Sequence, residues 1–157
     1  MRSFKQYITE IGDSSFPWRF TGSDEDGEYH RYHISHPTDS SKDTAVTIIH
    51  DYPDSEGEKH GAEVTFRRKG ETGNDRFKKT GDMSVKGAAN MFATVRDIMR
   101  HHAENNPSVS HFEFTSDKSE KSRRKLYDRF TKKIGGEIDR RFEDDGIINY
   151  VIPANKL

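Results

Sequence analysis

The chain has 157 residues, a length that fits one domain and is short for two. Its 26 Lys and Arg residues nearly cancel its 27 Asp and Glu residues, so the net charge of -1 gives no overall attraction to nucleic acid or to an anionic membrane. Because there is no cysteine, disulfides, thiolate nucleophiles and cysteine-ligated zinc sites are excluded. Ten Phe, six Tyr and one Trp predict a folded chain with a small aromatic core.

The sequence gives no sign of a membrane partner. No apolar run approaches the roughly 18 residues that a membrane-spanning helix needs, and the N-terminus lacks the hydrophobic stretch of a signal peptide. We therefore expect a soluble, cytoplasmic protein without a strong nucleic-acid signal.

The first half of the chain predicts a short helix, a linker and an antiparallel meander of strands. Residues 1–12 carry apolar side chains at the spacing of one helix face, and residues 13–27 form a polar linker that leads into the turn Thr21–Glu28. Runs rich in β-branched and aromatic residues, bounded by turn residues, predict strands at Glu28–His36, Asp43–Tyr52 and His60–Lys69, with a further candidate at Asp75–Thr80.

The second half changes to the spacing of helices. Apolar residues recur every three or four positions from Gly87 to about Asn105, which predicts an amphipathic helix. The remaining predicted elements are a strand at Ser110–Thr115, a helix capped by Ser119 and stopped at Gly135-Gly136, and strands at Glu137–Phe142 and Ile147–Ile152.

Two motifs lie on the predicted helices. SVKGAA (Ser84–Ala89) begins the first one, and KLYDRF (Lys125–Phe130) lies on the second. SVKGAA resembles the Gln/Arg-x-x-Gly-x-Gly/Ala loop of the GCN5-related N-acetyltransferase (GNAT) family, with Gly87 and Ala89 in register, and KLYDRF resembles the Leu-Tyr segment of that family. The resemblance covers roughly residues 43–152.

This resemblance implies both a fold class and an extent for the domain. The fold class is α+β and GNAT-like, an antiparallel meander followed by helix-strand-helix-strand-strand in one central mixed sheet. We expect residues 28–157 to form a single GNAT-like domain.

The same resemblance implies an acyltransferase that moves acetyl from acetyl-CoA to an amine acceptor. The start of a helix presents unpaired N–H groups and a partial positive charge, so the backbone of Lys86, Gly87, Ala88 and Ala89 would hold the pyrophosphate of an acyl-CoA. Tyr127 would be the general acid that returns a proton to the leaving thiolate.

Several positions depart from the family pattern and indicate a degenerate site. Ser84 stands where the family prefers Gln or Arg, Arg123 replaces a small residue, and Gly135 lies farther from Tyr127 than the usual spacing. The paired helices that usually shape the acceptor site have no counterpart in residues 28–43. The alternative is therefore a non-catalytic protein of the same fold that binds a host protein or is packaged in a virion.

The general base stays unassigned. The family often uses a Glu or an ordered water beside the strand that precedes the loop, and His60 and Glu63 are the nearest candidates if His60–Lys69 is that strand. If Asp75–Thr80 takes that place instead, neither residue need lie close to the reacting groups.

Both motifs also have a structural interpretation. Small residues such as those of Ser84–Ala89 permit close packing at any helix start. Tyr127 also fits the apolar stripe of an amphipathic helix, together with Leu126 and Phe130.

Eight histidines raise the question of a metal site. His30, His33 and His36 are evenly spaced, but on a strand only His30 and His36 share a face. His101-His102 suits the negative end of a helix dipole. We predict no metal site from these patterns.

The N-terminal peptide MRSFKQYITEIG carries a second resemblance. It is similar to the short leader of many proteins of T-even-like bacteriophages, a capsid-targeting segment cut after a hydrophobic-x-Glu triplet, here Ile8-Thr9-Glu10. This likeness implies a phage-encoded protein of the host cytoplasm that is packaged in the capsid. An ordinary frayed helix is the other interpretation.

Overall fold

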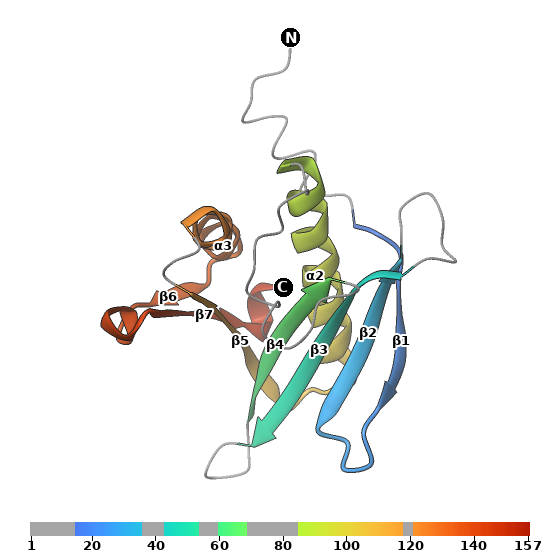
Figure 1. The fold of residues 1–157 in the computed structure, drawn as a ribbon. Coiled ribbons are helices and arrows are strands. Elements are labelled where there is room, and N and C mark those ends of the chain that lie inside the picture. The colour runs from blue at the N-terminus through green and yellow to red at the C-terminus, as the bar shows by residue number, and fades with distance from the viewer. Residues whose placement is uncertain (1–14, 36–42, 54–59, 69–84, 118–120) are drawn as a thin grey trace.

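The computed structural model describes residues 15–35, 43–53, 60–68, 85–117 and 121–157. Within these ranges, seven strands form one sheet in the order β1-β2-β3-β4-β5-β7-β6 (Figure 1). The strands are β1 (Trp18–Ser23), β2 (Tyr29–Ser35), β3 (Asp43–Pro53), β4 (His60–Arg68), β5 (Val109–Asp117), β6 (Glu137–Asp139) and β7 (Ile147–Pro153). The helices are α2 (Val85–Asn105) and α3 (Lys121–Ile134), with short 3-10 turns η2 (Glu143–Asp145) and η3 (Ala154–Lys156).

The sheet is mixed, as predicted. β1 to β4 form an antiparallel meander, β4 and β5 run parallel, and β7 pairs antiparallel with both β5 and β6. A parallel pair needs a crossover connection, and α2 supplies it between β4 and β5. The α+β class and the expected order of meander, helix, strand, helix, strand and strand are therefore confirmed.

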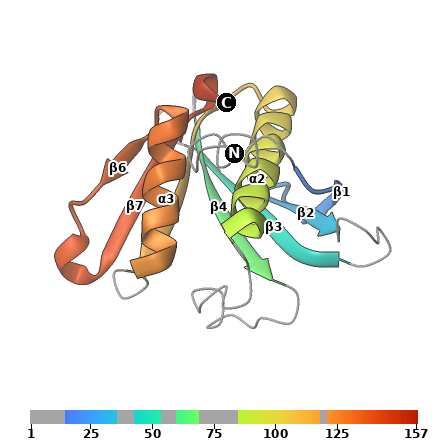
Figure 2. The ribbon, with the colours of Figure 1, turned by 90° about the horizontal axis from the view of Figure 1, so that it is seen from above.

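Both helices lie on the same face of the sheet (Figure 2). Side chains alternate between the two faces of a strand, so Phe112 and Phe114 of β5 point to one face. Phe112 belongs to the core cluster under α2, and Phe114 lies beside Phe130 of α3 with ring centroids 6.4 Å apart. Among the described residues, no α-helix covers the opposite face of the sheet.

The core explains why α2 is a helix. Its apolar positions Met91, Ile98 and Met99 fall on one face and are buried. They join side chains that β2, β3, β4, β5 and β7 direct to the same face, namely Tyr32, Ile34, Ala45, Ile49, Ala62, Val64, Phe112 and Ile152. One continuous core therefore lies between α2 and the sheet.

Most predicted ends lie within two residues of the observed ones, and two predictions differ by more. β1 lies within residues 13–27, the segment expected to be a linker, because an edge strand pairs on one side only and most of its residues stay exposed. β6 ends at Asp139 instead of Phe142, because the Asp139 carboxylate accepts hydrogen bonds from the backbone and guanidinium of Arg141 and turns the chain there. The segments 1–12 and 75–80 and Ser119 lie outside the described residues.

Candidate functional site

The centre of the sheet divides where β4 and β5 separate. These parallel strands pair from His60 with Val109 to Glu63 with Glu113. Beyond this point both continue as strands, yet among the described residues they pair only with their outer neighbours, β3 and β7. Figure 2 shows β4 running away from β7 and β6. We call this place the strand divergence; it begins after Glu63 and Glu113.

The predicted phosphate-binding residues lie at the start of α2. The helix begins at Val85, so Lys86, Gly87, Ala88 and Ala89 follow within its first turns. The first N–H groups of a helix have no acceptor within it. β4, the described strand that precedes α2, runs toward this end of the helix in both ribbon views (Figures 1 and 2). β4 is thus the last described strand before α2, and the residues between them, including the candidate strand 75–80, lie outside the described ranges.

Tyr127 packs edge-on against three aromatic rings. Its ring centroid lies 5.3 Å from that of Phe92 on α2, 5.2 Å from that of Phe114 on β5 and 5.6 Å from that of Tyr150 on β7. Phe114 is the first residue of β5 beyond the strand divergence. The aromatic packing expected from the apolar stripe is present, with Tyr127 only partly buried, and the same contacts place Tyr127 beside the divergence. Its role as an acid stays a prediction.

The opposite face of the sheet carries a group of titratable side chains at the same point. Glu63 and Glu113 are direct cross-strand neighbours. The Tyr52 hydroxyl donates a hydrogen bond to the Glu113 carboxylate, and His111 Nε2 lies 3.7 Å from Glu113 Oε1. Burial raises the pKa of the Tyr52 hydroxyl, and the hydrogen bond to Glu113 raises it further. We call Tyr52, Glu63, His111 and Glu113 the open-face cluster.

Gly61 makes room for this cluster. A Cβ atom at Gly61 would lie 2.7 Å from both Tyr52 Oη and His111 Nε2. Of the open-face cluster, the sequence singled out only Glu63. The other residues stand on strands whose mutual register cannot be read from periodicity, and register is what brings them together.

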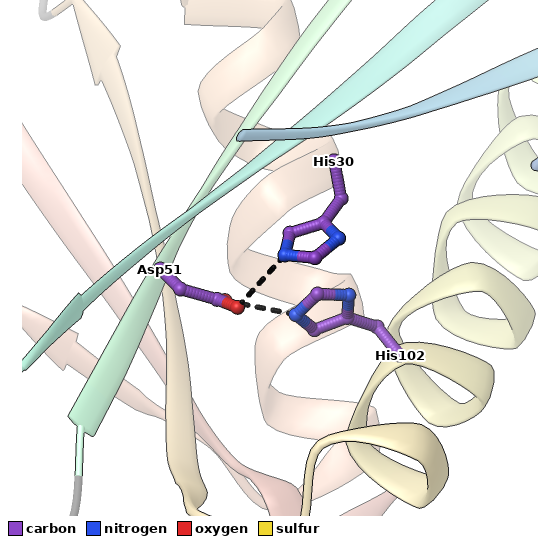
Figure 3. A group of neighbouring side chains, drawn as sticks. All are labelled: His30, Asp51 and His102. Atoms are coloured by element: carbon purple, nitrogen blue, oxygen red, sulfur yellow. Dashed lines mark hydrogen bonds and ion pairs between the residues drawn. The ribbon is translucent and has the colours of Figure 1, made fainter. Parts of the chain in front are cut away.

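A second polar group lies under α2. His30 of β2, Asp51 of β3 and His102 of α2 point toward one another (Figure 3). His102 Nε2 lies 2.8 Å from Asp51 Oδ1, and His30 Nε2 lies 3.1 Å from Asp51 Oδ2. Of the evenly spaced histidines, only His36 was expected to share a strand face with His30, and His36 is outside the described residues. The partners seen here come from other elements.

His60 lies at the edge of this second group. Its Nε2 is 4.0 Å from Asp51 Oδ2, on the helix-covered face. Glu63 is three residues later and therefore points to the opposite face. The two candidate bases thus lie on opposite faces of the sheet, and of the two only Glu63 stands at the strand divergence.

Comparison with known proteins finds similarity in structure alone. No protein-family model matches the chain, and no curated protein matches it. Among the solved structures, 13 chains match. RimL, the ribosomal L7/L12 alpha-N-protein acetyltransferase in complex with coenzyme A, aligns with a TM-score of 0.49 and 11% identity over 82% of this chain and 64% of its own. This chain therefore spans less than two thirds of RimL.

Two further solved structures also align with this chain. Arabidopsis thaliana NAA60 in complex with acetyl-CoA aligns with a TM-score of 0.49 and 13% identity over 82% of this chain and 78% of its own. The GNAT domain of S. lividans PAT aligns with a TM-score of 0.45 and 13% identity over 95% of this chain and 84% of its own.

Proposed function

We propose that this protein is a GNAT-like acyltransferase that moves acetyl from acetyl-CoA to an amine. The observation that carries the proposal is the separation of the parallel strands β4 and β5 after Glu63 and Glu113, with α2 beginning at the end toward which β4 runs. Separated parallel strands leave backbone groups without sheet partners, and a helix start offers N–H donors to phosphate.

The residues present suit an acyl-CoA. Lys86 supplies a positive charge, and the small residues Gly87, Ala88 and Ala89 allow phosphate oxygens to approach the backbone. Acetyl-CoA supplies an activated thioester. Tyr127 would give its hydroxyl proton to the sulfur that leaves when the amine nitrogen bonds to the acetyl carbon.

The open-face cluster suits the amine side of the reaction. Glu63 and Glu113 bring two carboxylates together, which favours a cationic amine. The amine must lose a proton to attack. We propose Glu63 as the acceptor of that proton because it is exposed and stands at the last paired position before the strands separate.

The proposal is tested by calorimetry and turnover. We expect acetyl-CoA and CoA to bind with one site per chain, and Gly87→Asp to abolish binding because it places a carboxylate beside the phosphates. Turnover is followed as thiol release with a panel of small amines and peptides. Tyr127→Phe keeps the aromatic packing and should lower kcat by roughly 100-fold or more with unchanged affinity.

Tyr29→Phe is the matched control, because Tyr29 is exposed and lies on β2, away from α3. Absence of binding at millimolar acetyl-CoA would remove the enzyme proposal. Equal losses of affinity and turnover in Tyr127→Phe would argue against its role as an acid.

The rival proposal is a non-catalytic protein of the same fold. The enclosure of Tyr127 by Phe92, Phe114 and Tyr150 favours it, since an aromatic core alone accounts for these contacts. Under this proposal residues 1–12 are a phage capsid-targeting leader. Mass spectrometry of purified virions should then find a chain that begins at Ile11. A chain absent from particles, together with acetyl-CoA turnover, would exclude the rival.

A further inference from the structure

We propose that His30, Asp51 and His102 bind a divalent transition-metal ion of the zinc class. The three residues come from β2, β3 and α2, and each offers one ligand atom within 4.8 Å of the others. Figure 3 shows the two imidazole rings pointing at the carboxylate from different elements. This site does not depend on acyl transfer, because it lies under α2 and shares no residue with the proposed acyltransferase site.

The distances fit a small coordination sphere. With metal–ligand bonds of about 2.0–2.2 Å, tetrahedral zinc holds its ligand atoms about 3.3–3.6 Å apart. The closest pairs here are His102 Nε2 to Asp51 Oδ1 at 2.8 Å and His30 Nε2 to Asp51 Oδ2 at 3.1 Å. An ion therefore requires these two pairs to separate by less than about 1 Å, and all three ligand atoms already lie within 4.8 Å of one another.

Each histidine is held by a hydroxyl group on its other nitrogen. His30 Nδ1 lies 3.1 Å from Ser23 Oγ, and His102 Nδ1 lies 2.9 Å from Tyr32 Oη. If each Nδ1–H donates to its hydroxyl oxygen, each Nε2 keeps its lone pair on the side of Asp51. Metal-ligating histidines are commonly oriented in this way by a hydrogen bond to the second nitrogen.

His30 Nε2 gives an independent indication. This buried nitrogen has no hydrogen-bond partner among the residues that the structure describes, although Asp51 Oδ2 is 3.1 Å away. The distance is short enough for an ion pair, but the direction is not that of a hydrogen bond. A buried imidazole nitrogen without a hydrogen-bond partner costs free energy. A metal ion between the His30 imidazole and the Asp51 carboxylate would bind this nitrogen and remove that cost.

Burial and ligand chemistry define the class of ion. The His102 side chain is fully buried, while those of Asp51 and His30 are 14% and 13% exposed, so the ion has a path from solvent. His60 Nε2, 4.0 Å from Asp51 Oδ2, lies near enough to become a fourth ligand. Imidazole nitrogens with one carboxylate suit zinc, cobalt or nickel, whereas calcium and magnesium prefer oxygen ligands alone.

The test is metal binding by the full chain after removal of metal with a chelator and dialysis. We expect Zn²⁺ to bind one ion per chain and to raise Tm, and excess EDTA to reverse the shift. Co²⁺ should give the intense visible absorption of a tetrahedral site. His30→Gln and Asp51→Asn should weaken Zn²⁺ binding by more than 100-fold. Ser23→Ala should weaken it by about 10-fold, the lower end of the effect of losing an outer partner.

His50→Gln is the matched control, because His50 precedes Asp51 on β3 and points to the opposite face of the sheet. It should bind Zn²⁺ as the unchanged chain does. The proposal is overturned if no saturable binding occurs up to 1 mM Zn²⁺, or if His30→Gln binds as tightly as the unchanged chain. Far-UV circular dichroism checks folding. If Asp51→Asn does not fold, the partly exposed His30→Gln variant and the Co²⁺ spectrum decide.

Discussion

Tyr150 joins three elements through one hydroxyl group. The residue is completely buried in β7, and its hydroxyl donates to Asp128 Oδ1 of α3 at 2.8 Å and accepts from Ser116 Oγ of β5 at 3.4 Å. Burial raises the pKa of this hydroxyl. The hydrogen bond to Asp128 and its charge raise the pKa further, and together these effects outweigh the opposite effect of Ser116. The folded state therefore keeps the Tyr150 proton where the unfolded state loses it.

This difference predicts a loss of stability in alkali that depends on Tyr150. Below the unfolded pKa of about 10 both states are protonated and the stabilisation is complete. As the pH rises above 10 only the unfolded state ionises, so the free energy of unfolding falls. Tyr150→Phe should cost about 1 kcal/mol at pH 7 through the lost hydrogen bond, and its free energy of unfolding should fall less steeply above pH 10.

Urea unfolding from pH 7 to 11 measures both effects. Tyr29→Phe is the control, because Tyr29 is exposed and its replacement leaves the bond to Asp128 in place. Parallel pH profiles for the unchanged chain and Tyr150→Phe would contradict this account.

The packing of a single residue was predictable where the spacing within its own helix or strand determines its neighbours. Tyr127 shares a helix face with Phe130, so its apolar packing follows from spacing alone. His102 also follows that spacing, but its partners Asp51 and Tyr32 lie 51 and 70 positions away in the chain. Which strand residues face a helix residue depends on register and on how the helix lies across the sheet. Spacing along the chain does not contain that information.

At the scale of elements, the connection from α3 to β6 is set by two glycines. Gly135 ends the helix with a φ of +83°, in the left-handed region that other residues rarely adopt. Gly136 lies against β7, and a Cβ atom there would be 2.7 Å from the carbonyl oxygen of Val151 and 2.8 Å from Thr131 Cγ2. A backbone oxygen cannot move without displacing β7. Gly136 therefore fixes how closely α3 approaches the sheet.

We predict that Gly136→Ala destabilises the protein by about 1–3 kcal/mol through this overlap. Gly135→Asn should cost less, because asparagine tolerates the left-handed region and a Cβ atom at Gly135 would meet only ordinary contacts, the nearest being Lys156 Cδ at 3.6 Å. Urea unfolding of both variants gives the comparison. A loss in Gly136→Ala no larger than that in Gly135→Asn would show that β7 adjusts freely.

Elements with one strongly apolar face were predicted closely, and polar edge elements were not. The β-branched residues of β3 and the apolar stripe of α2 mark these elements within the sequence. The sequence of β1 resembles that of a linker, because the strand pairs on one side only. β6 ends before its predicted end, because Arg141 folds back on Asp139. In the first case pairing with another strand decides the outcome, and in the second a side-chain contact that the alternation of apolar and polar residues does not contain.

At the scale of the whole molecule, the strand divergence raises the question of whether the sheet behaves as one unit. β4 and β5 share only the pairs from His60 with Val109 to Glu63 with Glu113. The core nevertheless crosses this junction. Phe112 is fully buried, faces Ala62 of β4 on one side and Ile152 of β7 on the other, and contacts His102 of α2 with ring centroids 6.2 Å apart.

Phe112→Ala should therefore destabilise the whole molecule in one cooperative transition. Removal of a fully buried phenylalanine costs about 3–5 kcal/mol, a large part of the roughly 5–15 kcal/mol by which a domain is stable. Trp18, the single tryptophan, lies on β1 and reports on the meander by fluorescence, while hydrogen exchange of β7 reports on the other side.

In Phe112→Ala, the unfolding midpoints from both probes should shift together to lower urea concentration. Ile147→Ala is the control, because Ile147 is at an exposed position of β7. It should change the free energy of unfolding from either probe by less than about 0.5 kcal/mol. If β7 opened first while Trp18 kept its original midpoint, the two sides of the divergence would be separate units. The continuous core under α2 argues for a single transition, because it includes side chains from both sides of the junction, such as Ala62 of β4 and Ile152 of β7.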